Sequence, residues 1–188
     1  GRRAVEVDAG HGGFGAVEGA AVAGAGAAQV FYFERDRSAA ALDFDAYEIF
    51  NVFGNLTATD VGDLDRDGYT DLIVAYTSAD DVLHLDWGEN DGTPASGAWS
   101  FHRIYSDSGG LLVEVIWPDD TVAGDFDGDG DLDVALAYGS QETFGDPDGR
   151  ILVFVNDGSP AGADWDSYVV KDWSEFVRWF NLAAEDVD

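Results

Sequence analysis

The chain has 188 residues, of which 46% are hydrophobic, and a formal net charge of −29 at pH 7. This length and apolar content are enough for a packed domain. The charge excludes nucleic acid and anionic membranes as expected partners, because long-range repulsion would oppose their approach. No apolar run is long enough to span a membrane, so we expect no membrane insertion. The absence of cysteine excludes disulfides and thiol chemistry.

The acidic character is carried by one residue type. Aspartate outnumbers glutamate 29 to 9, and arginine outnumbers lysine 8 to 1. Such a bias is typical of proteins from salt-loving organisms, in which a dense acidic surface keeps the molecule hydrated. An ordinary acidic secreted protein is the other interpretation, and composition does not decide between them.

The first third of the chain predicts two strands and little else. Gln29–Phe33 and Phe44–Phe50 are rich in aromatic and β-branched residues, as strands are. Upstream, the run 10–28 is nearly all Gly and Ala, and the segment 8–15 lacks the repeated carboxylates that appear later. Asn55-Leu-Thr57 forms an N-glycosylation sequon, which by itself does not establish glycosylation.

Two nine-residue loops repeat the spacing D-x-D-x-D-G-x-x-D, and a third copy begins near the end of the sequence. Alternating carboxylates can direct several oxygen atoms at one point, and hard anionic oxygens are the ligands that Ca²⁺ prefers. The predicted side-chain ligands are Asp63, Asp65, Asp67 and Asp71 in the first loop and Asp125, Asp127, Asp129 and Asp133 in the second. The carbonyl groups of Tyr69 and Asp131 complete the two sets, and a third, truncated site begins with Asp186 and Asp188.

An EF-hand loop starts with the same letters but needs a bidentate Glu at its twelfth position and a helix on either side. The twelfth residues here are Val74 and Leu136, and the apolar segments 72–76 and 134–138 predict buried strands. The sequence therefore excludes an EF-hand. A solvated acidic turn is the alternative for a single loop, but two copies with the same glycine and the same following strand favour calcium. We expect the ion to be structural.

Each predicted calcium loop is followed by the same series of elements. A second strand leads into an Asn-Asp-Gly turn, and a tryptophan then opens a further strand. Four short strands joined by tight turns in about 60 residues make one propeller blade. The matching segments are 82–87 and 151–155 for the second strand, 90–94 and 156–160 for the turn, and 99–104 and 165–170 for the last strand.

These loops and turns resemble FG-GAP and VCBS-type repeats, which build calcium-binding β-propellers, including the head of integrin α subunits. The resemblance covers about residues 56–188 and implies four-stranded blades with calcium between the first two strands. We therefore predict an all-β fold with about three blades. Because three blades do not usually close a ring, we expect a longer protein or an assembly of copies. The predicted units are 1–58 as a partial blade without calcium, 59–120 and 121–181 as calcium blades, and 182–188 as the start of another.

No pattern predicts catalysis. The sequence has no G-x-S-x-G, no H-E-x-x-H and no phosphate-binding glycine loop in a strand–helix context. The three histidines, His11, His84 and His102, are dispersed, so we expect no enzyme. Trp99 and Trp165 recur at matching positions and predict packing between blades. The other tryptophans stand singly, and those in the connections, Trp117, Trp173 and Trp179, either stack on sugars or a protein partner or pack internally.

Calcium affinities typical of extracellular modules are too weak for the cytosol, so the predicted sites favour an extracellular protein. The resemblance implies adhesion or recognition, with a glycan or protein ligand at a cell surface. Two alternatives remain open. One is a non-catalytic propeller region of a larger polysaccharide-active enzyme, and the other is a self-assembling subunit of an extracellular filament or surface layer.

Overall fold

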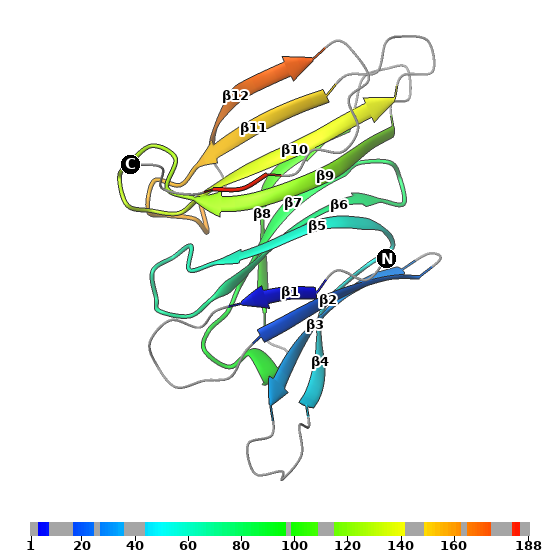
Figure 1. The fold of residues 1–188 in the computed structure, drawn as a ribbon, viewed down its shortest axis with the longest axis vertical. Helices are drawn as coiled ribbons and strands as arrows, with labels where there is room; N and C mark the ends of the chain where they lie inside the picture. The colour runs from blue at the N-terminus through cyan, green and yellow to red at the C-terminus, as the bar shows by residue number, and fades with distance from the viewer. Residues whose placement is uncertain are drawn as a thin grey trace.

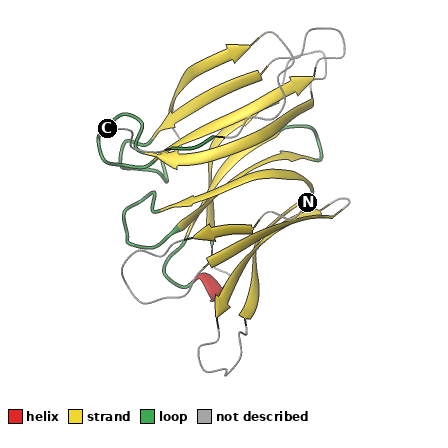
Figure 2. Ribbon diagram, in the orientation of Figure 1, coloured by secondary structure: helices red, strands yellow, loops and turns green. Residues whose placement is uncertain are grey.

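The computed structural model describes residues 4–7, 17–24, 27–35, 44–96, 99–108, 115–141, 149–162, 165–173 and 182–184. Over these residues the chain forms twelve strands and one short 3₁₀ helix, η1, at Pro94–Ser96. The strands make three four-stranded antiparallel sheets, each with its strands in chain order (Figures 1 and 2). This is the arrangement of propeller blades, and it confirms the predicted all-β class.

The first sheet contains both strands predicted in the first third of the chain. It also contains a strand within the Gly/Ala run, which we did not predict because such residues offer little side chain to pack. The segment 8–15, from which we expected no calcium binding, lies outside the described residues. The strands of this sheet are β1 (Ala4–Val7), β2 (Val17–Gly24), β3 (Ala27–Arg35) and β4 (Phe44–Val52).

The second and third sheets contain the two predicted calcium loops, each between the first and second strand. Both sheets begin ahead of residues 59 and 121, where the predicted units start, because the first strand is long and precedes the loop. The second sheet consists of β5 (Gly54–Gly62), β6 (Asp71–Ser78), β7 (Leu83–Glu89) and β8 (Ser100–Asp107). The third consists of β9 (Val115–Gly124), β10 (Asp133–Gln141), β11 (Gly149–Val155) and β12 (Asp166–Trp173).

The second sheet lies between the other two and is covered on both faces (Figure 1). In β6, alternate side chains point to opposite faces, so Leu72 and Val74 pack toward the first sheet and Ile73 toward the third. A strand buried on both faces reads as a continuous apolar run, which is why 72–76 has no polar alternation.

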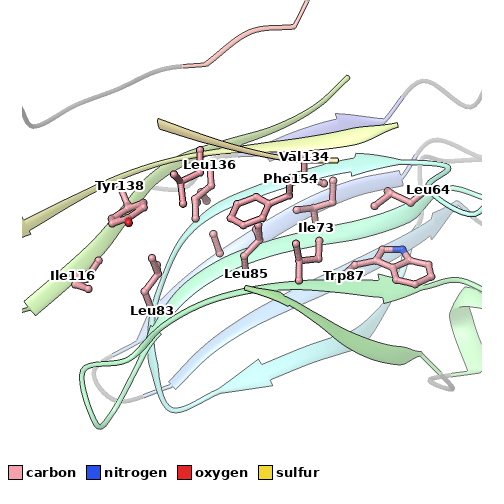
Figure 3. Packing of buried hydrophobic residues seen from close by; sticks show 14 residues of the cluster. Leu64, Ile73, Leu83, Leu85, Trp87, Ile116, Val134, Leu136, Tyr138 and Phe154 are labelled. Atoms are coloured by element: carbon pink, nitrogen blue, oxygen red, sulfur yellow. The ribbon is translucent and has the colours of Figure 1, made fainter. Parts of the chain in front are cut away.

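The larger core lies between the second and third sheets. Side chains of both sheets point toward one another there, as Figure 3 shows for Ile73 and Leu85 against Leu136 and Phe154. Each fully buried Leu, Ile or Phe contributes about 1.5–3 kcal/mol relative to an exposed one. This core therefore fixes how the two sheets stack, and with them the two loops at their edge.

The two repeated tryptophans have the packing role that the sequence predicted. Trp99 packs against the core between the first and second sheets, and Trp165 against the core between the second and third. Each indole Nε1 donates to the carbonyl of the proline that ends the Asn-Asp-Gly segment, Pro94 or Pro160, at 3.1 Å. The same contact in both repeats anchors the chain after its Asn-Asp-Gly turn.

Candidate metal centres

The two Asp-rich loops leave the second and third sheets on the same side of the molecule (Figure 2). We call residues 63–71, between β5 and β6, the first loop, and residues 125–133, between β9 and β10, the second loop. The strand β5 lies against β9, and the Ala123 N–H donates to Asp60 Oδ2 at 2.7 Å. The strands that carry the loops are therefore held together directly.

Three carboxylates converge in each loop. Their oxygen atoms lie within 4.8 Å of one another, which is close enough to share a metal ion. The structure thus brings together three of the four side chains predicted as ligands in each loop. The groups are Asp63, Asp65 and Asp71 in the first loop and Asp125, Asp127 and Asp133 in the second.

The carboxylates of the first loop also hold its backbone turn in place. In the first loop, Asp65 Oδ1 accepts from the Asp67 N–H at 3.1 Å, and Asp67 Oδ1 accepts from the Tyr69 N–H at 2.8 Å. These are Asx turns, in which a short acidic side chain bonds the backbone two residues on. Asp63 Oδ2 accepts from the Gly68 N–H at 3.1 Å. Gly68 has φ 92°, a conformation that favours glycine and turns the loop back on itself.

The second loop repeats this pattern. Asp127 Oδ1 accepts from the Asp129 N–H at 3.0 Å, and Asp129 Oδ1 accepts from the Asp131 N–H at 2.8 Å. Asp125 Oδ2 accepts from the Gly130 N–H at 3.0 Å, and Gly130 also has φ 92°. Asp67 and Asp129 therefore lie outside the converging groups and use one oxygen to order the backbone. A ligand role for them, and for the carbonyls of residues 69 and 131, stays a prediction.

The last carboxylate of each loop is buried at the start of the following strand and connects two turns. Asp71 accepts from the Leu64 N–H at 3.0 Å and from the Asn90 N–H at 2.9 Å. Asn90 opens the Asn-Asp-Gly turn after β7, so this turn is part of the site. The sequence showed the turn as a repeated feature but gave no sign that it reaches the metal loop.

The equivalent carboxylate in the third sheet, Asp133, makes the same pair of contacts. It accepts from the Phe126 N–H at 2.8 Å and from the Asn156 N–H at 2.9 Å. In both repeats, one buried aspartate therefore ties the metal loop to the turn that begins with an asparagine.

Burial makes the charged form of these carboxylates unfavourable. It raises the pKa of Asp71 to about 6, and the N–H groups of Asn90 and Leu64 offset this only in part. Burial also raises the pKa of Asp67 and of Asp133. A cation between the carboxylates would reverse this effect, because an opposite charge within a few ångströms favours the ionised form.

The residues present fit a calcium ion. The Asp63 Oδ1 atom is buried and has no hydrogen-bond partner in the part of the chain that the structure describes. A buried carboxylate oxygen normally has a partner, so this one is suited to a ligand role. The candidate metal ligands are all carboxylate oxygens. Hard cations such as Ca²⁺ prefer oxygen ligands, whereas softer transition metals prefer nitrogen and sulfur.

The other residues singled out in the sequence are sheet residues or lie outside the description. His84 lies next to the Tyr76 ring, with centroids 5.0 Å apart, and contacts Arg103. His102 stacks on Trp87 at 4.7 Å, and its Nε2 lies 3.1 Å from Glu89 Oε2. Nothing is described of Asp186, Asp188, His11 and Trp179.

The chain returns to β9 just before the third Asp-rich copy. The Leu182 N–H donates to Asp120 Oδ2 at 2.8 Å. A methyl group at Gly124 would lie 2.8 Å from the Ala184 Cβ. Residues 182–184 therefore lie along the third sheet in the way that β9 lies along β5.

Comparison with known proteins agrees with this geometry. Residues 63–136 match the family model described as FG-GAP-like repeat. The match begins at the first carboxylate of the first loop, includes the whole second loop and ends within β10. This part of the chain is therefore similar to an FG-GAP-like repeat, and it lies within two four-stranded antiparallel sheets. No curated protein matches the chain. No helix in the described ranges is both long and apolar enough to cross a membrane.

Proposed function

We propose that this protein is an extracellular calcium-binding β-propeller module that recognises glycans or proteins at a cell surface, with calcium in a structural role. The observation that carries the proposal is the pair of equivalent carboxylate groups, which occupy the same position in two repeats. Their location within the region similar to an FG-GAP-like repeat supports an adhesive module rather than an enzyme.

The proposed structural role follows from what the carboxylates connect. Asp71 and Asp133 bind both their own loop and the next Asn-Asp-Gly turn, so an ion held by them would fix two turns of one sheet. Without an ion, two carboxylates about 4 Å apart repel by roughly 4 kcal/mol at an effective dielectric near 20. At calcium concentrations between Kd and ten times Kd, each site would stabilise the fold by about 0.4–1.4 kcal/mol.

The proposed location follows from the same chemistry. A chain without cysteine has no disulfides to constrain it, and bound calcium would supply that constraint outside the cell. Aromatic side chains are available for recognition on the loop side. Tyr69 is 47% exposed and Phe126 42% exposed, and both belong to the metal loops. A ligand that stacks on them would bind in a calcium-dependent way.

Thermal unfolding with and without calcium tests the metal sites. The metal-free sample contains excess chelator, and ionic strength is held constant because the chain is so acidic. We expect calcium to raise Tm, with at least half of the increase lost in each of Asp65→Ala and Asp127→Ala. Asp166→Ala, an exposed change of the same charge on β12, serves as the control and should keep the full increase. An unchanged Tm with no calcium bound would disprove the metal sites.

Binding to a glycan array and to cell surfaces tests recognition. We expect binding in calcium that is lost in chelator and reduced in Tyr69→Ala or Phe126→Ala. If a calcium-loaded, folded sample binds no glycan and no cell-surface protein, the metal sites would stand and the recognition role would not.

A further inference from the structure

One buried asparagine side chain contacts the backbone of both metal loops. Asn156, which opens the turn after β11, is only 1% exposed. Its Nδ2 donates to the Leu64 carbonyl of the first loop at 2.9 Å and to the Leu132 carbonyl of the second loop at 3.2 Å. The position of either loop therefore depends on the position of the other.

The same residues connect carboxylates of the two converging groups. The Leu64 N–H donates to Asp71, and the Asn156 N–H donates to Asp133. A continuous series of hydrogen bonds therefore runs from Asp71 through Leu64 and Asn156 to Asp133. All its members are buried, so water does not compete for these bonds.

An arginine of the first loop makes a second connection. Arg66 Nε lies 2.7 Å from Asp131 Oδ1 of the second loop. Its guanidinium lies over Gly130, where an added Cβ would be 2.8 Å from an Arg66 terminal nitrogen. Asp131 is only 8% exposed, and its N–H also donates to Asp129. Arg66 thus holds the segment of the second loop whose carbonyl is a predicted ligand.

The backbone of Arg66 indicates that its side chain matters. Arg66 has φ 61°, in the left-handed region that non-glycine residues adopt at a cost. The equivalent residue of the second loop is Gly128, with φ 83°. Glycine would therefore suit the turn at position 66 better, and the contact with Asp131 offsets the strain that arginine brings.

We propose that the two loops bind calcium as a coupled pair, in which filling either site raises the affinity of the other and Arg66 carries most of the coupling between them. This inference rests on the proposed calcium sites. An ion in the first loop orders the Leu64 carbonyl and Arg66, which then hold the second loop in its binding geometry. Because coupling is reciprocal, an ion in the second loop does the same for the first.

Repulsion between the two ions does not reverse this effect. The first loop has four aspartates and one arginine, and the second has five aspartates, so each loop remains net negative after binding one Ca²⁺. The residual ion–ion repulsion is screened at physiological salt, where the Debye length is about 8 Å. The ordering of the contacts that the two loops share therefore makes the coupling between the two sites positive.

Calorimetric calcium titration at fixed ionic strength tests the coupling, with bound calcium counted by equilibrium dialysis. Asp127→Ala retains only the first site, and Asp65→Ala only the second. The coupling factor is the overall two-site binding constant of the unmodified protein divided by the product of the two single-site constants. We expect a factor of about 5–10, near the lower end of typical allosteric couplings.

The same three titrations are repeated with Arg66→Ala in each protein. Loss of a positive charge will change every individual affinity, but the ratio cancels an effect that acts on the sites separately. We expect the coupling factor to fall to about 2, because the Asn156 bonds to both loops remain. Arg150→Ala is the control, because it removes another partly exposed arginine, which pairs with Asp172 on the third sheet. It should leave the factor unchanged.

Two results would overturn the inference, namely a factor near 1 in the unmodified protein or an undiminished factor in Arg66→Ala. In both, calcium still binds, so the proposed metal sites would stand. If the unmodified protein binds no calcium by dialysis, the proposed sites themselves are wrong and the coupling is wrong with them.

Discussion

The first and second loops share most of their internal hydrogen bonds but have different neighbours. In the second loop Asp125 Oδ1 also accepts from the Gly128 N–H at 2.8 Å, whereas Asp63 Oδ1 has no partner among the described residues. In both loops, the second and third aspartates bond the backbone two residues on, and the last aspartate bonds an Asn-Asp-Gly turn. The residues between the aspartates differ in burial. Leu64 in the first loop is 1% exposed and belongs to the core between the second and third sheets, whereas the equivalent Phe126 is 42% exposed.

Equivalent residues at two further positions of the loops make different contacts. Arg66 reaches the second loop, and its equivalent is Gly128, which has no side chain. The Tyr69 ring lies against Gly92 of its own sheet, and its equivalent, the Asp131 carboxylate, lies near Gly158 and pairs with Arg66. The comparison teaches that the aspartate positions build the candidate metal sites, while the positions between them set the contacts that differ between the two loops.

The largest difference should appear when the second position of each loop is shortened. Leu64→Ala removes a fully buried side chain from a core and should destabilise the protein by about 2–5 kcal/mol. Phe126→Ala should cost less than about 1 kcal/mol, because much of that ring is already in water. Denaturant unfolding in saturating calcium measures both. Similar losses would show that the two positions are equivalent after all.

The two turn asparagines give the next comparison. Asn156→Ala leaves the carbonyls of Leu64 and Leu132 without their partner and should cost about 2–4 kcal/mol. Asn90→Ala removes one such bond, to the Thr70 carbonyl, and should cost about 1–2 kcal/mol. The difference is the bond between sheets, and the same unfolding assay measures it. Equal costs would mean that this bond does not stabilise the stacking.

The pH dependence of stability should change sign with calcium. In the metal-free protein the pKa of Asp71 is raised to about 6, above its ordinary 3.8, so the folded state takes up a proton that the unfolded state does not. Stability should therefore rise by roughly 2–3 kcal/mol as pH falls from 7 to 4. With calcium bound the ionised form is favoured, and stability should fall over the same range as protons displace the ion.

Asp71→Asn is the control for this prediction, because the amide resembles the protonated acid. Its metal-free form should lose most of the rise toward low pH, although relief of general acidic repulsion will leave a part. Chemical unfolding at several pH values measures the effect. If the stability of metal-free Asp71→Asn depends on pH as the unmodified protein does, the increase in stability toward low pH comes from the loss of net charge and not from Asp71.

The smallest expected effect concerns Arg66 itself. In saturating calcium, Arg66→Ala should cost only about 0.2–1 kcal/mol, because the guanidinium is half exposed and such ion pairs contribute little. Arg66→Gly should be no less stable than Arg66→Ala, since glycine relieves the left-handed backbone. Thermal unfolding compares the two. A loss well above 1 kcal/mol would show that Arg66 is a structural residue rather than mainly a link between sites.

The sequence by itself determined the features that depend on neighbouring residues. The aspartate spacing and the glycine after the third aspartate predict the loops, because Asx turns and a left-handed glycine are local. The apolar runs after the loops predict buried strands, and the repeated order of strands and turns predicts four-stranded sheets. The strand β2 was missed because its Gly/Ala composition carries little strand signal.

Only the tertiary structure decided what joins the two loops. Asn156 and the Leu64 carbonyl are 92 residues apart and meet because two sheets stack on a shared core. The same stacking brings Arg66 to Asp131 and decides which of two equivalent residues, Leu64 or Phe126, is buried. Nothing in the local pattern distinguishes these positions, since burial and pairing depend on which sheet lies on the other side.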